Sequence, residues 1–151
     1  MTLEASIQTL IDRQALKDLV DTFSNLADEK RMDDQMALFT EDAQVLTYLD
    51  GQLFADAQGR AHICKVFSDY LANFHTVYHL NGQHTVTLHG DTASAINYCH
   101  VVLVGHQNGK NMMHTHGVRY LDDYVKQGSQ WFIRKRVANF MVSDSRELGV
   151  A

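Results

Sequence analysis

Residues 76–105 read TVYHLNGQHTVTLHGDTASAINYCHVVLVG, and this stretch decides the fold class. It holds two long runs of β-branched and aromatic residues on either side of Gly90-Asp91, which predicts two antiparallel strands joined by a tight turn. Two similar runs follow, again separated by short turns that contain glycine. The four expected strands cover residues 76–89, 92–105, 112–126 and 130–142. The second half of the chain is therefore expected to be a meander of long strands.

The first half of the chain is expected to be mainly helical. Apolar residues at helical spacing predict a short helix over residues 5–11. A change of phase then predicts a second helix from about Arg13 to about Lys30, with Asp12 as its cap. A third, short helix is expected over residues 36–39.

A hairpin and one further helix are expected between these helices and the long strands. Residues 43–49 alternate in polarity, and Asp50-Gly51 is a strong hairpin turn. Gly59 then precedes an amphipathic stretch with apolar residues at helical spacing from Ile63 to Leu71. Helices followed by long antiparallel strands predict an α+β fold, with helices packed on one face of a curved sheet.

The composition fits one globular domain over residues 1–151 and excludes several other classes of protein. Hydrophobic residues make up 45% of the chain, and no apolar run approaches the roughly 20 residues that span a bilayer. A net charge of -5 disfavours a nucleic-acid partner, because such partners select a concentrated basic surface. No basic segment followed by an apolar block opens the chain, so a cytoplasmic location is predicted. Cys64 and Cys99 are expected to be reduced.

Several short segments, taken together and in order, resemble the SnoaL-like group within the nuclear-transport-factor-2-like superfamily. These segments are Leu26-Ala27-Asp28, residues 38–43, Gly59-Arg60, Tyr78-His79, residues 90–93 and Trp131-Phe132-Ile133. The group includes scytalone dehydratase and hexachlorocyclohexane dehydrochlorinase, and the resemblance runs from about Ile7 to about Val142. It implies a cone-shaped, strongly curved, mixed but mostly antiparallel sheet with N-terminal helices packed over it and an internal cavity.

The resemblance also implies a set of catalytic residues. Asp28 matches the aspartate that ends the first long helix in these lyases, and His79 matches the histidine that this aspartate orients. His106 lies in a segment that resembles the one with the second active-site histidine of scytalone dehydratase. Arg136 falls where the dehydrochlorinase has a cavity arginine.

Two observations weigh against a direct transfer of that activity. Gly117 and Arg119 stand where scytalone dehydratase has a serine and an asparagine, and Ala27 stands at a tyrosine position, so scytalone itself is not expected as the substrate. The helical period places Asp28 roughly 140° from the centre of the apolar stripe of its helix. Asp28 would therefore face inward only if the helix ends or bends there.

The expected chemistry is proton transfer. A carboxylate that accepts a hydrogen bond from one imidazole nitrogen fixes the tautomer and raises the basicity of the other nitrogen. Tyrosine hydroxyls are candidate donors to a carbonyl or enolate oxygen, and an arginine is a candidate to stabilise developing negative charge. The candidate substrate-binding residues are Tyr48, Tyr78, Tyr98, Arg119 and Asn81.

Nine histidines raise the question of a metal site. His114 and His116 would place two imidazoles on one face of a strand, and His100 is expected on the adjoining strand. However, no nearby acidic residue completes a recognisable pattern, and strand alternation favours the outer face of the sheet for this pair. No metal is therefore expected. The sequence also lacks nucleotide, flavin and phosphate-binding motifs, so no cofactor is expected.

We predict a small, cofactor-independent lyase or isomerase of the dehydratase type, acting on a compact, largely apolar hydroxylated or carbonyl compound. His79, oriented by Asp28, would be the general base, with His106, Arg136 and a cavity tyrosine as its partners. The alternative is a non-catalytic ligand-binding or assembly subunit, because the small β subunits of ring-hydroxylating dioxygenases resemble the same cone. In that case side chains would fill the pocket.

Both predictions include a homo-oligomer. One exposed face of the sheet is expected to carry Trp131, Val118 and Tyr120. Such an apolar face should be covered by another subunit rather than by water. A homodimer and a homotrimer are equally compatible with this expectation.

Overall fold

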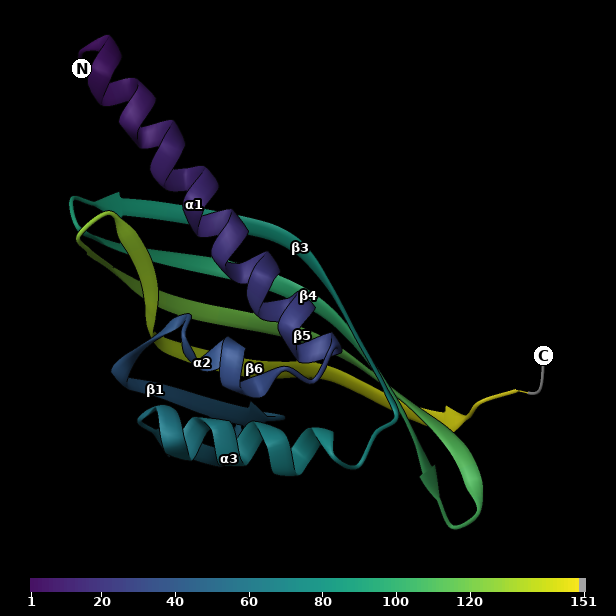
Figure 1. The fold of residues 1–151 in the computed structure, drawn as a ribbon. Coiled ribbons are helices and arrows are strands. Elements are labelled where there is room, and N and C mark those ends of the chain that lie inside the picture. Colours follow the sequence, from purple (N-terminus) through teal and green to yellow (C-terminus); the bar gives the residue numbers. More distant parts are fainter. Residues whose placement is uncertain (150–151) are drawn as a thin grey trace.

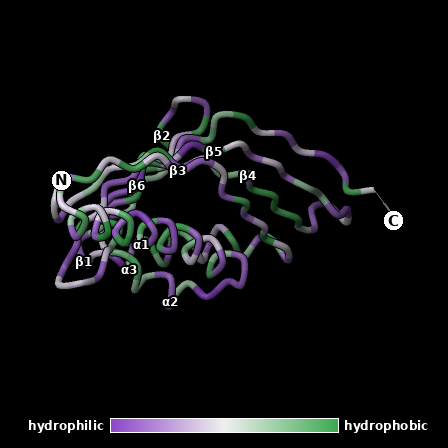
Figure 2. The backbone as a smooth tube through the Cα atoms, turned by 90° about the horizontal axis from the view of Figure 1, so that it is seen from above, coloured by the Kyte–Doolittle hydropathy of each residue, from purple (hydrophilic) through white to green (hydrophobic). Residues whose placement is uncertain are grey.

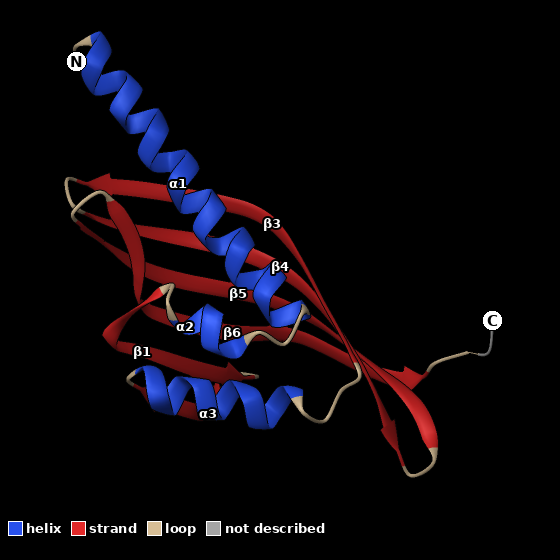
Figure 3. Cartoon of the chain, in the orientation of Figure 1, coloured by secondary structure: helices blue, strands red, loops and turns tan. Residues whose placement is uncertain are grey.

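The computed structural model describes residues 1–149, so the last two residues of the expected domain lie outside the described residues. Helices and strands follow one another as Figures 1 and 3 show. In chain order the elements are α1 (Leu3–Asp28), α2 (Met32–Met36), β1 (Phe39–Leu49), β2 (Gln52–Gln58), α3 (Arg60–Leu71), β3 (Thr76–His89), β4 (Thr92–Gln107), β5 (Lys110–Gln127) and β6 (Gln130–Glu147).

The six strands form one sheet in the order β2-β1-β6-β5-β4-β3. Strands β3 to β6 form the predicted antiparallel meander, and β1 lies parallel to β6, so the sheet is mixed but mostly antiparallel. The helices cover one face of this curved sheet, and the far ends of β4, β5 and β6 extend past them (Figures 1 and 2). The predicted α+β class is confirmed. Within the described residues, no helix is both long and apolar enough to cross a membrane.

Helix α1 is continuous, so the predicted break and cap at Asp12 are wrong. The change of phase has another cause. Leu10 and Ile11 are 67% and 54% exposed. The N-terminal part of α1 extends beyond the sheet (Figure 1). Buried residues of α1 begin only at Leu16. The first apolar stripe therefore faces solvent and the second faces the core, without any interruption of the helix. The cap is Thr2, whose hydroxyl accepts a hydrogen bond from a backbone N–H of the first turn.

Asp12 instead ties the middle of α1 to the sheet. The indole Nε1 of Trp131 donates to its carboxylate at 3.0 Å, and Nζ of Lys126 lies 3.1 Å from the same oxygen. Partial burial alone would raise the pKa of Asp12, but the hydrogen bonds from Trp131 and Lys126 outweigh it and lower the pKa below its ordinary value. The ionised carboxylate is thus the form that the fold favours.

We expect Asp12→Asn to lower the free energy of unfolding by about 1 kcal/mol at neutral pH. A carboxyl whose pKa is lowered by folding stabilises the fold above its unfolded pKa, and this contribution is lost as the pH falls through the folded pKa. The difference between wild type and variant should therefore disappear in acid. Urea unfolding at neutral pH and near pH 3 measures it, with the exposed Asp18→Asn as control. A difference that is the same at both pH values would contradict this assignment.

The third predicted helix lies earlier in the chain than expected. Helix α2 stops at Met36, and Phe39 already belongs to β1, so the helix expected over residues 36–39 is wrong. The backbone N–H of Ile133 donates to the carbonyl of Leu38 at 2.8 Å, which draws this segment to the edge of β6. Phe39 is then fully buried against Phe23, with ring centroids 5.8 Å apart. Sheet pairing and aromatic packing decide the local structure here.

The predicted hairpin and the helix after it are confirmed. Asp50 and Gly51 both have positive φ, 50° and 77°, as a two-residue turn between antiparallel strands requires. β1 and β2 pair on either side of this turn. Gly59, with φ 81°, directly precedes α3, whose fully buried Ile63 faces the core.

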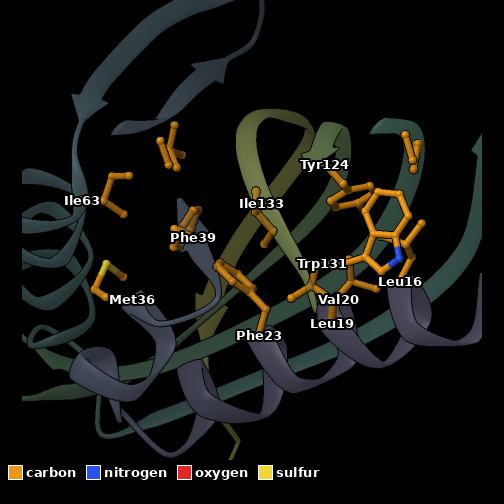
Figure 4. Packing of buried hydrophobic residues seen from close by; sticks show 14 of the residues in the cluster. Leu16, Leu19, Val20, Phe23, Met36, Phe39, Ile63, Tyr124, Trp131 and Ile133 are labelled. Carbon is orange, nitrogen blue, oxygen red and sulfur yellow. The ribbon is translucent and has the colours of Figure 1, made fainter. Parts of the chain in front are cut away.

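Two clusters of buried apolar side chains form the core. In the larger one, drawn in Figure 4, the buried side of α1 meets β1, α3, β5 and β6. Its members include Leu16, Leu19, Val20, Phe23, Phe39, Ile63, Tyr124, Trp131 and Ile133. The second cluster packs the end of α1 and the end of α3 on the middle of the sheet. It includes Ala27, Leu71, Val77, Val101, Leu103, Val118 and Tyr120.

Trp131, Val118 and Tyr120 are buried in these clusters, so the prediction that they form an exposed sheet face is wrong. Alternate residues of β5 turn toward the helices, and the Trp131 indole is fixed by its hydrogen bond to Asp12 of α1. The expected homodimer or homotrimer loses its supporting argument and stays a prediction.

Candidate active site

A cavity of about 160 Å³ lies between the helices and the sheet. Its walls are mainly phenylalanine, valine, leucine and alanine side chains. The exposed lining residues Leu49, Phe54 and Tyr70 place its opening to solvent beside them. The polar or hydroxyl-bearing residues that line it are Gln35, Thr47, Tyr70, His79, Tyr120 and Arg136. The structure therefore contains the expected internal cavity, and it is predominantly apolar.

Asp28 and His79 form a hydrogen-bonded pair at the wall of this cavity. Nδ1 of His79 lies 2.6 Å from Oδ1 of Asp28, and the backbone N–H of His79 donates to the other carboxylate oxygen at 3.1 Å. The side chains are 10% exposed for His79 and 26% exposed for Asp28. Because Asp28 holds Nδ1, Nε2 is the ring nitrogen left to meet a ligand.

The end of α1 explains why Asp28 reaches the sheet. Asp28 is the last residue of the helix, and Lys30 then adopts a positive φ of 57°. The N–H groups of Lys30 and Arg31 donate back to the carbonyls of Ala27 and Leu26, which closes the helix and turns the chain. α1 thus ends at the point that an inward-facing Asp28 requires.

Asn81 fixes β3 against α1. Its Nδ2 donates to the carbonyl of Val20 at 3.2 Å and to Asp21 at 3.0 Å, and the Ser24 hydroxyl donates to its Oδ1 at 3.3 Å. Asn81 is not among the residues that line the cavity, so the predicted substrate contact has no support here. Its bonds instead hold the strand of His79 beside the helix of Asp28.

Arg136 lies in the cavity wall and is 1% exposed. It forms a two-pronged ion pair with Asp122, with Nε to Oδ1 at 2.8 Å and Nη2 to Oδ2 at 2.9 Å. The guanidinium is stacked between the rings of Phe23 and Tyr120, 4.4 and 3.9 Å from their centroids. Burial alone would lower the pKa of Arg136, but the Asp122 carboxylate raises it above its ordinary value, so the guanidinium stays charged.

A buried polar chain leads from Arg136 away from the cavity. The Tyr124 hydroxyl donates to Oδ2 of Asp122 at 2.7 Å, and Nε2 of His84 lies 3.0 Å from that hydroxyl. Burial raises the pKa of Tyr124, and burial also lowers the pKa of His84. Asp122 is absent from the predicted site residues. Tyr120, Asp122 and Tyr124 stand at every second position of one strand and therefore share a face. An acid between two aromatic residues on one face was the available signal, because a buried acid requires a partner.

His106 lies away from the cavity. Its side chain is exposed near the end of β4, which runs two residues beyond the predicted strand. Its ring lies 5.0 Å from the ring of His75, which in turn hydrogen bonds Asn111 at 2.8 Å. This position gives no support to the predicted role as a second catalytic histidine.

Four other predicted substrate-binding residues also lie outside the cavity lining: Tyr48, Tyr78, Tyr98 and Arg119. Tyr78 and Tyr98 are 52% and 40% exposed, and the Arg119 guanidinium packs over the Tyr98 ring at 6.0 Å from its centroid. Because neighbouring positions on a strand point to opposite faces, these side chains occupy the outer face of the sheet. The tyrosine that the sheet supplies to the cavity is Tyr120.

His114 and His116 lie on the same face of β5 as Val118 and Tyr120, so their predicted place on the outer face is wrong. Their rings pack on Phe74 and Phe140, with centroids 5.7 and 5.0 Å apart, and their Nδ1 atoms hydrogen bond serines of β6. Among the described residues, no group of three His, Cys, Asp or Glu side chains is arranged to hold a metal ion.

Gln35 is a cavity residue that sequence reasoning missed. It is 0% exposed, and its Nε2 donates to the backbone carbonyl of Phe23 at 2.9 Å. Its Oε1 has no hydrogen-bond partner within the described residues. In the sequence it follows Asp33 and Asp34 in a helix of five residues, which is too short for its periodicity to mark Gln35 as buried.

The sequence and the fold together match one family. Residues 8–137 match the family model of the SnoaL-like domain. The chain belongs to the SnoaL-like family. An uncharacterized protein of Mycobacterium tuberculosis is 31% identical to it over 133 residues, which cover 87% of each chain.

Two solved structures show the same fold as this SnoaL-like protein. A putative scytalone dehydratase from Novosphingobium aromaticivorans superposes with a TM-score of 0.81 at 18% identity, over 97% of this chain and 95% of that chain. A hexachlorocyclohexane dehydrochlorinase, LinA type 2, superposes with a TM-score of 0.80 at 13% identity, over 96% and 95%. The predicted membership of the SnoaL-like group is confirmed, while these low identities show only a shared fold.

Proposed function

We propose that this SnoaL-like protein is a cofactor-independent lyase or isomerase that moves a proton with the pair of Asp28 and His79. The observation that carries the proposal is the 2.6 Å contact between Nδ1 of His79 and the Asp28 carboxylate at the wall of an apolar cavity. A histidine held in this way keeps its proton on Nδ1 and offers Nε2 as a general base.

The pair suffices for an elimination. Nε2 of His79 takes a proton from carbon, the C–H electron pair forms a double bond to the neighbouring carbon, and the leaving group departs from that carbon with its own electron pair. A departing hydroxide takes the proton back from the ring and leaves as water, so no external acid is needed. In an isomerisation the same proton returns to a different carbon. Asp28 stabilises the cationic ring between the two transfers.

Arg136 is suited to assist at the other end of the ligand. Arg136 lines the cavity, and its Nη1 has no partner among the described residues. A charged donor in an apolar surrounding stabilises negative charge that develops on a carbonyl or enolate oxygen. We therefore assign Arg136 to charge stabilisation and His79 to proton transfer.

The non-catalytic alternative has less support. An assembly subunit of this fold was expected to fill its pocket with side chains, whereas a cavity of about 160 Å³ is present. A histidine with a purely structural role would bond only to backbone groups, whereas His79 pairs with a carboxylate. A putative scytalone dehydratase and a hexachlorocyclohexane dehydrochlorinase share the fold, so the fold is compatible with an elimination.

The tautomer of His79 tests this proposal without a known substrate. We expect ¹⁵N NMR of the neutral ring to place the proton on Nδ1 in the wild type. In Asp28→Asn the preference should weaken, because the neutral amide is a poorer acceptor than the carboxylate. The exposed Asp42→Asn serves as the matched control and should leave the ring unchanged. A wild-type ring protonated on Nε2, or one that is indifferent to Asp28→Asn, would rule out the assigned base.

A further inference from the structure

We propose that Gln35 is a specificity-determining residue of the cavity, and that the ligand is a single-ring compound whose hydroxyl group donates a hydrogen bond to Gln35 Oε1. The inference rests on the proposed function, because it takes the cavity as the substrate site. It adds the ligand class and a residue outside the proton-transfer pair.

The first observation is that two residues of the cavity wall each have an unpartnered, buried polar atom. Of the buried side-chain atoms that lack a hydrogen-bond partner among the described residues, two belong to residues that line the cavity: Oε1 of Gln35 and Nη1 of Arg136. One is an acceptor and the other is a charged donor. Buried polar groups in native proteins are almost always paired, so both atoms indicate a missing polar partner.

The second observation is that both groups are fixed in place and both contact Phe23, the amide of Gln35 through the Phe23 carbonyl and the guanidinium of Arg136, which Asp122 holds, through the Phe23 ring. The amide nitrogen of Gln35 donates to the Phe23 backbone carbonyl at 2.9 Å, which fixes the amide and leaves Oε1 as its free end. The guanidinium of Arg136 lies 4.4 Å from the Phe23 ring centroid. An unpartnered acceptor and an unpartnered donor therefore belong to side chains that both contact one residue of α1. A hydroxyl is the smallest group that both donates and accepts, and it would satisfy the acceptor outright.

The third observation is the size of the cavity. Its volume is about 160 Å³, and an apolar cavity of on the order of 150 Å³ holds one benzene ring. Sites for larger, drug-sized ligands typically measure roughly 300 to 1,000 Å³. This volume matches a single six-membered ring with a small substituent rather than two fused rings.

Cyclohexanol, cyclohexanone and toluene test the proposal, because they are close in size and differ in hydrogen bonding. The alcohol donates and accepts, the ketone only accepts, and toluene does neither. We expect calorimetric titration of the wild type to show that cyclohexanol binds about tenfold more tightly than cyclohexanone, since the ketone leaves Gln35 Oε1 unpaired. This comparison needs no variant and so does not depend on the folding of one.

Gln35→Met then assigns the preference to this side chain. Methionine keeps the length and the apolar stem but has no comparable acceptor. The variant should bind cyclohexanol and cyclohexanone with nearly equal affinity and toluene as the wild type does. The exposed Gln130→Met should keep the tenfold preference for the alcohol.

Three results would overturn the proposal. Equal affinity of the wild type for alcohol and ketone would mean that Gln35 is satisfied by water, and an unchanged preference in Gln35→Met would place the hydroxyl elsewhere. Absence of binding by all three compounds would exclude a single-ring ligand. Since binding requires no proton transfer, these results are independent of the tautomer of His79, and the two proposals can fail separately.

Discussion

Arg136→Met is expected to lower the free energy of unfolding by about 3 to 5 kcal/mol. The variant removes the only strong cationic partner that the described structure gives to the buried Asp122, which accepts both prongs of the guanidinium at 2.8 and 2.9 Å. It also removes the planar group stacked between Phe23 and Tyr120. An uncompensated buried carboxylate is the larger of these two losses, because dispersion contacts are partly restored by the methionine side chain.

Urea unfolding of three variants separates these contributions. Arg134→Met is the matched control, because Arg134 is exposed two positions earlier on the same strand, and it should change stability by less than about 0.5 kcal/mol. The double variant Arg136→Met with Asp122→Leu should be more stable than Arg136→Met alone, since it removes the buried charge together with its partner. A double variant that is less stable than the single one would show that the loss comes from packing rather than from the isolated carboxylate.

The strands could be predicted from the sequence because their signals are local. The stretch 76–89 coincides with β3. It contains β-branched residues that fit a pleated surface, and Gly90 follows its last residue. The helical half was harder. The stripe with Leu10 and Ile11 has the same spacing as a core stripe, and periodicity carries no information on whether a neighbour is present to cover it. Where α1 extends beyond the sheet, the apolar residues face solvent.

The site residues divide in the same way between local and long-range causes. Asp28 and His79 are 51 positions apart, and only the resemblance to a family connected them before the structure. Strand alternation places Tyr98 and Cys99 on opposite faces of the sheet, but both faces of the long strands carry apolar side chains, so alternation could not tell which face is inward. Gln35 is buried because α2 packs on α1. A helix of five residues is too short for its sequence pattern to predict this contact.

The second large effect is expected on catalysis. His79→Ala should lower kcat by about a hundredfold to ten-thousandfold, the usual contribution of a positioned general base, with a smaller change in KM. The substrate is found by a screen of single-ring compounds that carry a hydroxyl or halogen leaving group. Turnover is detected by the appearance of the double bond in the ring. His89→Ala is the matched control, because His89 lies at the exposed end of the same strand, outside the cavity lining. Equal kcat in His79→Ala and the wild type would exclude His79 as the base.

Asp28→Asn should lower kcat by at least about tenfold, because the amide accepts the Nδ1 hydrogen bond less strongly and does not stabilise the charged ring. The double variant is the sharper measurement. If Asp28 acts only through His79, Asp28→Asn with His79→Ala should have the same kcat as His79→Ala alone, since residues that act as a unit are not additive. A further loss in the double variant would mean that Asp28 contributes by another route, such as the bond of its carboxylate to the backbone N–H of His79. Comparison of the two single variants with the double variant thereby separates two roles of Asp28, the orientation of the imidazole and the support of the strand that carries it.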